Sequence, residues 1–311
     1  MKTLLLISFF IPQLLLAQEL FPSTEQATTL PKKTISPRLS YQHYQEPLGR
    51  SKNWVGLRLM YGLTKTLTVI GTVSISNHHV KTYPGNLFEY FKNHHKKIYP
   101  AFPYLAEGVH LYAKQRIFKK DGPKKHFRIS LYGEASKVFA VHDNAEPNLM
   151  GDNSGIGAGI ILTKLSDRFA ISFTGGFIHA FKYKDSIVSF ESGDAMNFTL
   201  SAGYRIYPKK YIGYDDLNIN VYIELFEKNY GAAKIKNRNV DFVNERFLPD
   251  DPYTYNSLIA NNYLEMRPAI QFILSSDLRF DLGMAVPLYK KSYLYYTPML
   301  FINIQKYIFA K

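Results

Sequence analysis

The chain has 311 residues, of which 46% are hydrophobic and 20% charged, with 38 Lys and Arg against 25 Asp and Glu. This much apolar material excludes a wholly disordered chain, and the absence of cysteine excludes disulfide scaffolds, thiolate metal sites and cysteine catalysis. The formal net charge of +13 is scattered, and neither a phosphate-binding glycine loop nor a zinc pattern accompanies it, so the sequence indicates no nucleic-acid partner.

The start of the chain has the form of a cleaved export signal. A short start containing Lys2 precedes an apolar run from Leu4 to Leu16, which Ala17 follows. A membrane anchor needs about 20 apolar residues, and this run is shorter. We therefore expect residues 1–17 to be removed during export.

Beyond the signal, apolar residues recur at every second position. In the stretch from Val55 to Ile75, one face carries mostly Leu and Val, and the other carries Gly, Thr, Ser and Arg58. A period of two over this length predicts β-strands. Twelve segments show the pattern, near residues 35–44, 54–63, 66–77, 104–118, 125–140, 154–164, 168–182, 194–207, 216–229, 262–275, 277–289 and 294–309.

These segments are too long for an ordinary globular strand of about 5–6 residues, and their length suits tilted membrane-spanning strands. Short links alternate with longer connections between them, as they do on the two sides of an outer-membrane barrel. The strands of a soluble β-sandwich would also alternate apolar and polar residues. Nothing in a sandwich, however, would require its connections to be short and long in turn. We predict an all-β fold, a transmembrane antiparallel up-and-down β-barrel of about 12 strands, in residues 34–311, preceded by a periplasmic N-terminal segment, residues 18–33.

Three short motifs resemble those of a known group of proteins. The stretch Tyr61 to Leu67 is similar to the strand–turn–strand signature of small Gram-negative outer-membrane barrels, and Lys164 to Phe169 echoes it. The end Tyr307 to Phe309 is similar to the terminal aromatic signal that the barrel assembly machinery reads. The nearest grouping is that of channel-like barrels, including the family associated with aromatic-compound uptake in phenol degradation. The resemblance implies an outer-membrane location among lipid and lipopolysaccharide, and it carries over no functional residue.

The alternation collects charged side chains on the inner face of the predicted barrel. Unpaired charges in a narrow lumen are costly, so one interpretation is a lattice of ion pairs that braces the wall. The other is a charged constriction that selects solutes, with anionic or polar solutes favoured because basic residues outnumber acids. The pore-lining candidates are Arg58, Arg116, Arg128, Glu134, Arg205, Glu224, Glu265, Arg267, Arg279 and Asp281, with His110 and Lys114 on the same face.

The sequence favours a passive channel or transporter for small polar or anionic solutes. A non-catalytic secretion or assembly partner, and a lipid-directed hydrolase using a pair such as His110 and Ser130, are the alternatives. Catalysis needs a base, a nucleophile and an orienting group in reach of one another, and no motif supplies them, so we expect no enzyme. Adjacent imidazoles diverge and nearby lysines repel cations, so we expect neither a metal site nor a cofactor, even at the four histidines His78, His79, His94 and His95.

The glycines at 155, 157 and 159 leave a strip of the inner wall without side chains. A glycine inside a strand often marks the close approach of another part of the chain. We expect either a bend in the strand or the close approach of an inward-folded loop there, with a solute path as the alternative.

Overall fold

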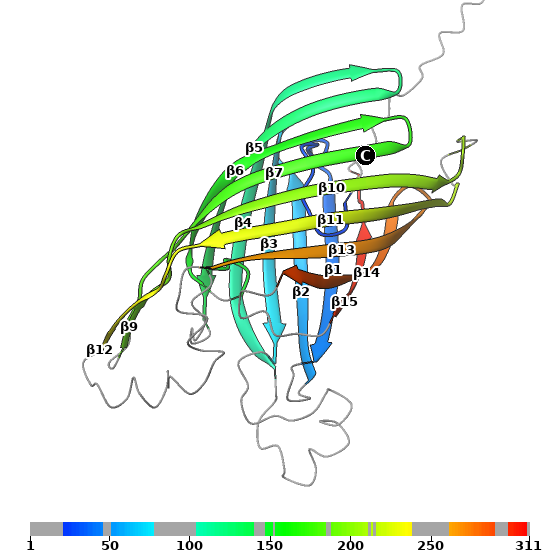
Figure 1. The fold of residues 1–311 in the computed structure, drawn as a ribbon. Helices are drawn as coiled ribbons and strands as arrows, with labels where there is room; N and C mark the ends of the chain where they lie inside the picture. Colours follow the sequence, from blue (N-terminus) through cyan, green and yellow to red (C-terminus); the bar gives the residue numbers. More distant parts are fainter. Residues whose placement is uncertain are drawn as a thin grey trace, which may run out of the picture.

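The computed structural model describes residues 21–45, 51–77, 104–139, 147–151, 153–184, 188–210, 213, 216–237, 261–289 and 298–309. Within this part, twelve antiparallel strands form a closed barrel (Figure 1). The predicted signal and the four loop histidines named above lie outside the described residues. No helix in the described part is long and apolar enough to cross a membrane.

The barrel strands follow chain order around the wall, and β15 pairs with β1 to close it. Their bounds are β1 Ile35–Gln45, β2 Ser51–Gly62, β3 Leu67–Ser76, β4 Leu105–Gly122, β5 Lys125–Val138, β6 Gly155–Ser166, β7 Phe169–Ala180, β10 Ala195–Tyr207, β11 Asn218–Tyr230, β13 Asn261–Leu274, β14 Leu278–Tyr289 and β15 Met299–Lys306. The predicted fold class and the twelve strands are therefore confirmed.

A small second sheet was not predicted from the sequence. It consists of β8 Tyr183–Lys184, β9 Val188–Glu191 and β12 Lys234–Asn237, in the order β12-β9-β8. These short strands lie just after β7, just before β10 and just after β11, and Figure 1 shows β9 and β12 beyond the barrel at lower left. They prolong the wall at one end of the barrel.

Strand β4 runs to Gly122, four residues beyond its predicted end. The pairing of β4 with β5 shifts between Arg116 and Phe118. This bulge places Ile117 and Phe118 both on the exposed side, which interrupts the period of two. The sequence pattern stops at the bulge, although the strand continues past it.

The two ends of the barrel differ, and we call them the turn end and the loop end. The turn end carries the connections between β2 and β3, β4 and β5, β6 and β7, and β13 and β14, each of at most four residues, and a longer one of ten residues between β10 and β11. Two of these are tight enough to hold Asp167, Ser275 and Ser276 at positive φ. The chain enters β1 and leaves β15 at the same end, as the predicted alternation of link lengths requires.

The outer face of the barrel is apolar and the inner face is polar. Leu57 and Leu111 on the outside are 53% and 59% exposed, whereas Asp281 and Gln271 on the inside are 0% exposed. Exposing an apolar face of this kind to water is unfavourable, whereas contact with the hydrocarbon of a membrane is not. The faces predicted from the sequence for β2, β10, β11 and β14 agree with the structure.

The loss of stability caused by a charge at a lipid-facing position should depend on the depth of that position in the membrane. Leu111 lies midway between the apolar start of β4 at Leu105 and its basic end at Lys120. We expect Leu111→Lys to destabilise the barrel by about 2–4 kcal/mol and Leu105→Lys, on the same strand near the end of the apolar band, by about 0–1 kcal/mol. Urea unfolding in vesicles, followed by heat-modifiable migration, measures both. Equal losses would contradict the placement of the membrane.

Candidate functional site

Residues 21–30, which we call the lumen segment, lie inside the barrel. The chain turns inward from β1, where the amide of Lys33 donates to the carbonyl of Gly62 over 2.8 Å. Leu30 then packs with Met60, Ile70 and Tyr307. Residues 18–33 were predicted to form a periplasmic segment, and because this stretch has no hydrophobic period, no pattern in it indicated a position inside the barrel.

One carboxylate of the wall holds the start of the lumen segment. Glu224 on β11 is 0% exposed, and it accepts hydrogen bonds from the backbone amides of Ser23 and Thr24, both at 3.0 Å. The hydroxyl of Thr24 also donates to Glu224 and lies 2.8 Å from the hydroxyl of Ser201 on β10. A buried carboxylate needs partners of this kind, since an unpaired one is costly.

Six other backbone groups of the lumen segment bind side chains from around the wall. Their partners are Thr163 for the amide of Ala27, Thr68 for that of Leu30, Arg279 for the carbonyl of Phe21, Arg38 and Asn303 for that of Pro22, Lys114 for that of Gln26 and Ser130 for that of Ala27. With Glu25 and Glu224 included, the contacts reach at least ten of the twelve barrel strands, which are β1 to β6, β10, β11, β14 and β15. These backbone groups of the extended peptide are thus satisfied by the wall rather than by secondary structure of the peptide itself.

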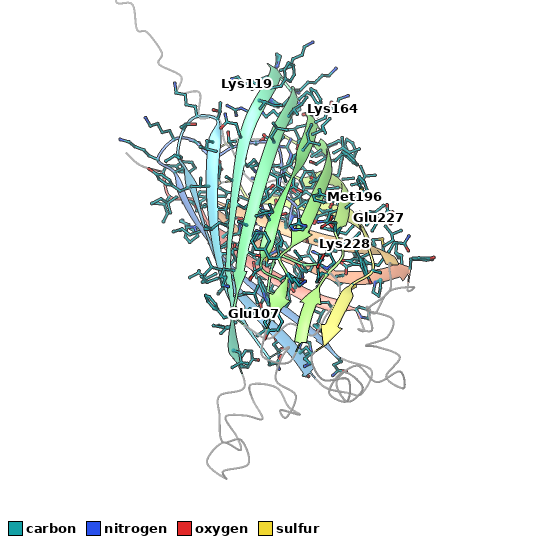
Figure 2. The ribbon with its side chains drawn as sticks, turned by 90° about the vertical axis from the view of Figure 1, so that its left-hand side faces the viewer. Glu107, Lys119, Lys164, Met196, Glu227 and Lys228 are labelled. Carbon is teal, nitrogen blue, oxygen red and sulfur yellow. The ribbon has the colours of Figure 1, made fainter. Side chains whose placement is uncertain are left out.

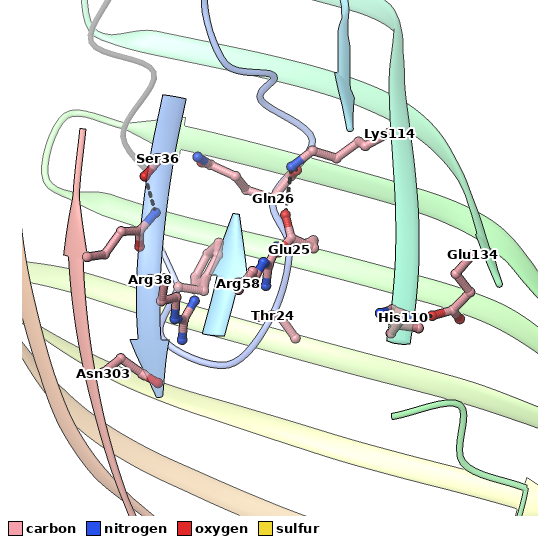
Figure 3. A network of polar contacts seen from close by, with 12 residues as sticks. Thr24, Glu25, Gln26, Ser36, Arg38, Arg58, His110, Lys114, Glu134 and Asn303 are labelled. Atoms are coloured by element: carbon pink, nitrogen blue, oxygen red, sulfur yellow. Dashed lines mark hydrogen bonds and ion pairs between the residues drawn. The ribbon is translucent and has the colours of Figure 1, made fainter. Parts of the chain in front are cut away.

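Glu25 is the charged centre of the lumen segment. Its carboxylate forms ion pairs with Arg58 on β2 and with Lys114 on β4, the latter at 2.9 Å (Figure 3). All three side chains are at most 18% exposed. Removing one partner of a buried ion pair leaves an uncompensated charge, so Glu25 neutralises a basic part of the wall.

The pore-lining candidates are found mostly in pairs. Arg279 binds Asp281 at 2.8 Å, and Arg267 binds Glu265. Arg128 binds Asp121 at 3.2 Å, Glu134 binds His110 at 2.8 Å, and Arg116 donates to the carbonyl of Lys65 at the turn end. Arg205 faces inward near the end of β10. Two further polar residues, Glu25 and Arg38, were missed; the alternation in β1 could have indicated Arg38, and no pattern indicated Glu25.

The wall at the level of the lumen segment has little contact with water. Asp281, Gln271, Glu224 and Ser201 are each 0% exposed, although they face the inside of a barrel. In an open pore these side chains would be wet. In this conformation the lumen segment and the wall side chains fill the barrel at that level.

A loop also folds inward at the loop end. Leu149 is 2% exposed, and the Lys228 ammonium donates to the carbonyl of Pro147 at 3.2 Å. A Cβ on Gly155 would lie 2.8 Å from a methyl of Leu149, so the close approach expected at the glycine strip is present at this position. Beside this loop, a cavity lined by Thr72, Ser74, His110 and Leu149, among others, has a volume of about 10 Å³, the limit for one water molecule.

The pair proposed for hydrolysis is not assembled. The hydroxyl of Ser130 donates to the carbonyl of Ala27 at 2.6 Å, and His110 contacts Glu134. Across the β4–β5 pairing, His110 lies opposite Ser136. Among the described residues, there is also no group of three or more His, Asp or Glu side chains able to hold a metal ion.

Comparison with known proteins places the fold. Neither a protein-family model nor a curated protein sequence matches the chain. An outer membrane channel from Pseudomonas putida F1 is similar in structure, with a TM-score of 0.58 and 14% identity over 93% of this chain and 100% of that one. The chain has the fold of a small outer-membrane barrel. A KdgM porin and the CymD monoaromatic hydrocarbon channel match with TM-scores of 0.39 and 0.37, at 8% and 10% identity over 88% and 89% of this chain and 99% and 88% of theirs, which is too low to support an argument.

The charge of Glu25 should hold the lumen segment in place. The chain has no cysteine, so an Ala27→Cys variant carries one thiol at a position that is 0% exposed. Breaking a buried ion pair costs about 3–5 kcal/mol, so adding Glu25→Gln should raise the rate of maleimide labelling by about two to three and a half orders of magnitude. The matched control is Glu134→Gln, which alters a pair outside the segment. Equal labelling in both backgrounds would mean that Glu25 does not hold it.

Proposed function

We propose that the protein is an outer-membrane channel for small polar solutes, in which the lumen segment occupies the path and withdraws to open it. The observation that carries the proposal is a polar, charged wall whose inner side chains are covered by one continuous peptide. If the segment only filled the barrel, apolar wall side chains would serve equally well, because they can replace buried ion pairs without loss of stability. A wall of Ser, Thr, Asn and paired charges suits water and solute once the peptide leaves.

The peptide is held by contacts that can be exchanged for water. Its partners are hydroxyl, amide and charged side chains, and each hydrogen bond contributes only about 0.5–1.5 kcal/mol net. A short apolar contact at each end, Phe21 against Tyr222 and Leu30 against Met60 and Ile70, adds to these. The segment has no covalent or secondary-structure link to the strands that it crosses, other than its connection to β1.

Withdrawal of the segment changes the charge of the lumen. In the occupied state Glu25 compensates Arg58 and Lys114, and the carbonyl of Pro22 accepts from Arg38. These three cations lie on β1, β2 and β4, on the same side of the wall, and they lose those partners when the segment leaves. A low-dielectric wall focuses the field of such charges along the path. The open channel is therefore selective for anions among small polar solutes.

The proposal is tested by deleting residues 21–30. In planar bilayers the deletion variant should conduct at a higher and steadier level than the full chain, and its reversal potential in a salt gradient should show anion preference. Changing Arg58 and Lys114 to Gln in the deletion variant should reduce that preference. Raising the salt to 1 M, where the screening length is about 3 Å, should reduce it further.

Heat-modifiable migration serves as the control that each variant has formed its barrel. A folded deletion variant that does not conduct, or that prefers cations, would contradict the proposal. An assembly or secretion role would then become the better explanation of the barrel.

A further inference from the structure

The turn end of the barrel is strongly basic. Its exposed lysines are spread over the rim and the short turns and are Lys32, Lys33, Lys65, Lys119, Lys120, Lys124, Lys125, Lys164, Lys209, Lys210 and Lys306. Among the described residues at this end, the acids are Asp121, Asp167, Asp216 and Asp277. Asp121 and Asp277 already pair with Arg128 and Lys306. Figure 2 shows Lys119 and Lys164 at this rim, at the opposite end from Glu107.

Four of these lysines, which we call the belt lysines, stand on the outer face of the wall. They are Lys120 on β4, Lys125 on β5, Lys164 on β6 and Lys306 on β15. Of these, Lys306 also pairs with Asp277 in the adjoining turn, at 2.6 Å. Alternation puts Lys164 on the same face as Ile160 and Leu162, and Lys306 on the same face as Ile302 and Ile304. Each such lysine continues a row of lipid-facing aliphatic residues toward the turn.

An aromatic residue adjoins two of the belt lysines, Lys120 and Lys164. Lys164 lies opposite Phe127 on one neighbouring strand and Ile171 on the other. Lys120 also lies opposite Phe127, whose ring centroid is 6.0 Å from that of Phe118. Aromatic rings favour the boundary between hydrocarbon and headgroups, and a lysine stem beside them extends its ammonium to the headgroup level.

A fifth cation on this face is engaged with an aromatic ring. The guanidinium of Arg168 lies 5.0 Å from the centroid of Tyr204, whose side chain is exposed on the outer face of β10. The contact is of the cation–π type and keeps the positive charge at the outer surface. The headgroup region at the turn end therefore faces cations from five strands or their adjoining turns.

The outer face at the loop end carries no such excess in the described residues. Lys182 pairs with Glu191 at 3.6 Å, and His179 contacts Asp194 at 2.7 Å. Lys137 and Glu227 are exposed there with opposite charges. The two ends of one apolar band thus present different charges to the lipid.

We propose that the belt lysines bind the headgroups of anionic phospholipids in the leaflet that surrounds the turn end. Their placement selects lipid over a soluble anion, because all four lie outside the barrel at the edge of the apolar band, and Lys120 and Lys164 lie beside an aromatic ring. In the orientation with short turns toward the periplasm, this is the inner leaflet of the outer membrane. The inference concerns the outer surface and is independent of what passes through the lumen.

The test measures lipid selection by the intact chain. The protein is reconstituted in vesicles of equal parts phosphatidylglycerol and phosphatidylcholine, extracted gently, and the retained lipids are counted by native mass spectrometry. We expect retained phosphatidylglycerol to exceed phosphatidylcholine. Replacing all four belt lysines by Gln should lower that ratio roughly tenfold, since each lysine near an anionic surface contributes separately, and replacing them by Arg should keep it.

A matched control removes the same charge elsewhere on the turn end. It changes Lys32, Lys33, Lys65 and Lys124 to Gln, which are exposed but lie before the first strand or in the turns, and the ratio should stay at the level of the unmodified chain. Heat-modifiable migration verifies folding, and Lys164→Gln with Lys306→Gln serves if the fourfold variant fails to fold. Equal loss in belt and control variants, or no selection by the unmodified chain, would overturn the proposal. So would poly-glutamate displacing the retained phosphatidylglycerol at equal carboxylate concentration, which would point to a soluble acidic partner.

Discussion

Closure of the sheet is the constraint on which the rest of the structure depends. A strand in hydrocarbon cannot leave its amides and carbonyls unpaired, so the wall has to return to its own first strand. Here β1 pairs with β15 over six registered residue pairs, from Arg38 with Gln305 to His43 with Leu300. Once the wall is closed, the period of two assigns every side chain to lipid or to the lumen, and the polar half of the sequence is enclosed.

Enclosure creates the second problem, which is charge inside a narrow space. The wall solves part of it with pairs between neighbouring strands or within one strand, such as His110 with Glu134 and Arg279 with Asp281. Arg58 and Lys114 are neutralised instead by Glu25, which is carried on a peptide outside the sheet. Charges that are neutralised by a separable peptide differ from charges paired within the wall, because they lose their partner when the peptide moves. This difference is the reason for proposing a gated channel rather than a permanently filled barrel.

Much of the fold could be predicted from the sequence, because alternation is a local property. The outward positions of Leu57 and Ile223 and the inward positions of Glu224 and Asp281 follow from it directly. The alternation did not predict the end of β4, because the bulge around Ile117 breaks the period of two. It also could not place the lumen segment, because Ser23, Ala27 and Leu30 find their partners about 200, 136 and 38 residues away. The inward positions of Arg58 and Lys114 were predictable, but their pairing with Glu25 was not.

The lumen segment contacts strands from both ends of the sequence, and these contacts constrain the order in which the protein folds. Its partners include Thr68 and Ser130 on early strands and Arg279 and Asn303 on the last hairpin. These side chains surround one space only after the final strand has joined the first. Although residues 21–30 are synthesised before any strand, they can complete their contacts only after all of them. The earliest part of the folded chain is therefore the last to settle, and its docking marks a barrel whose seam has closed.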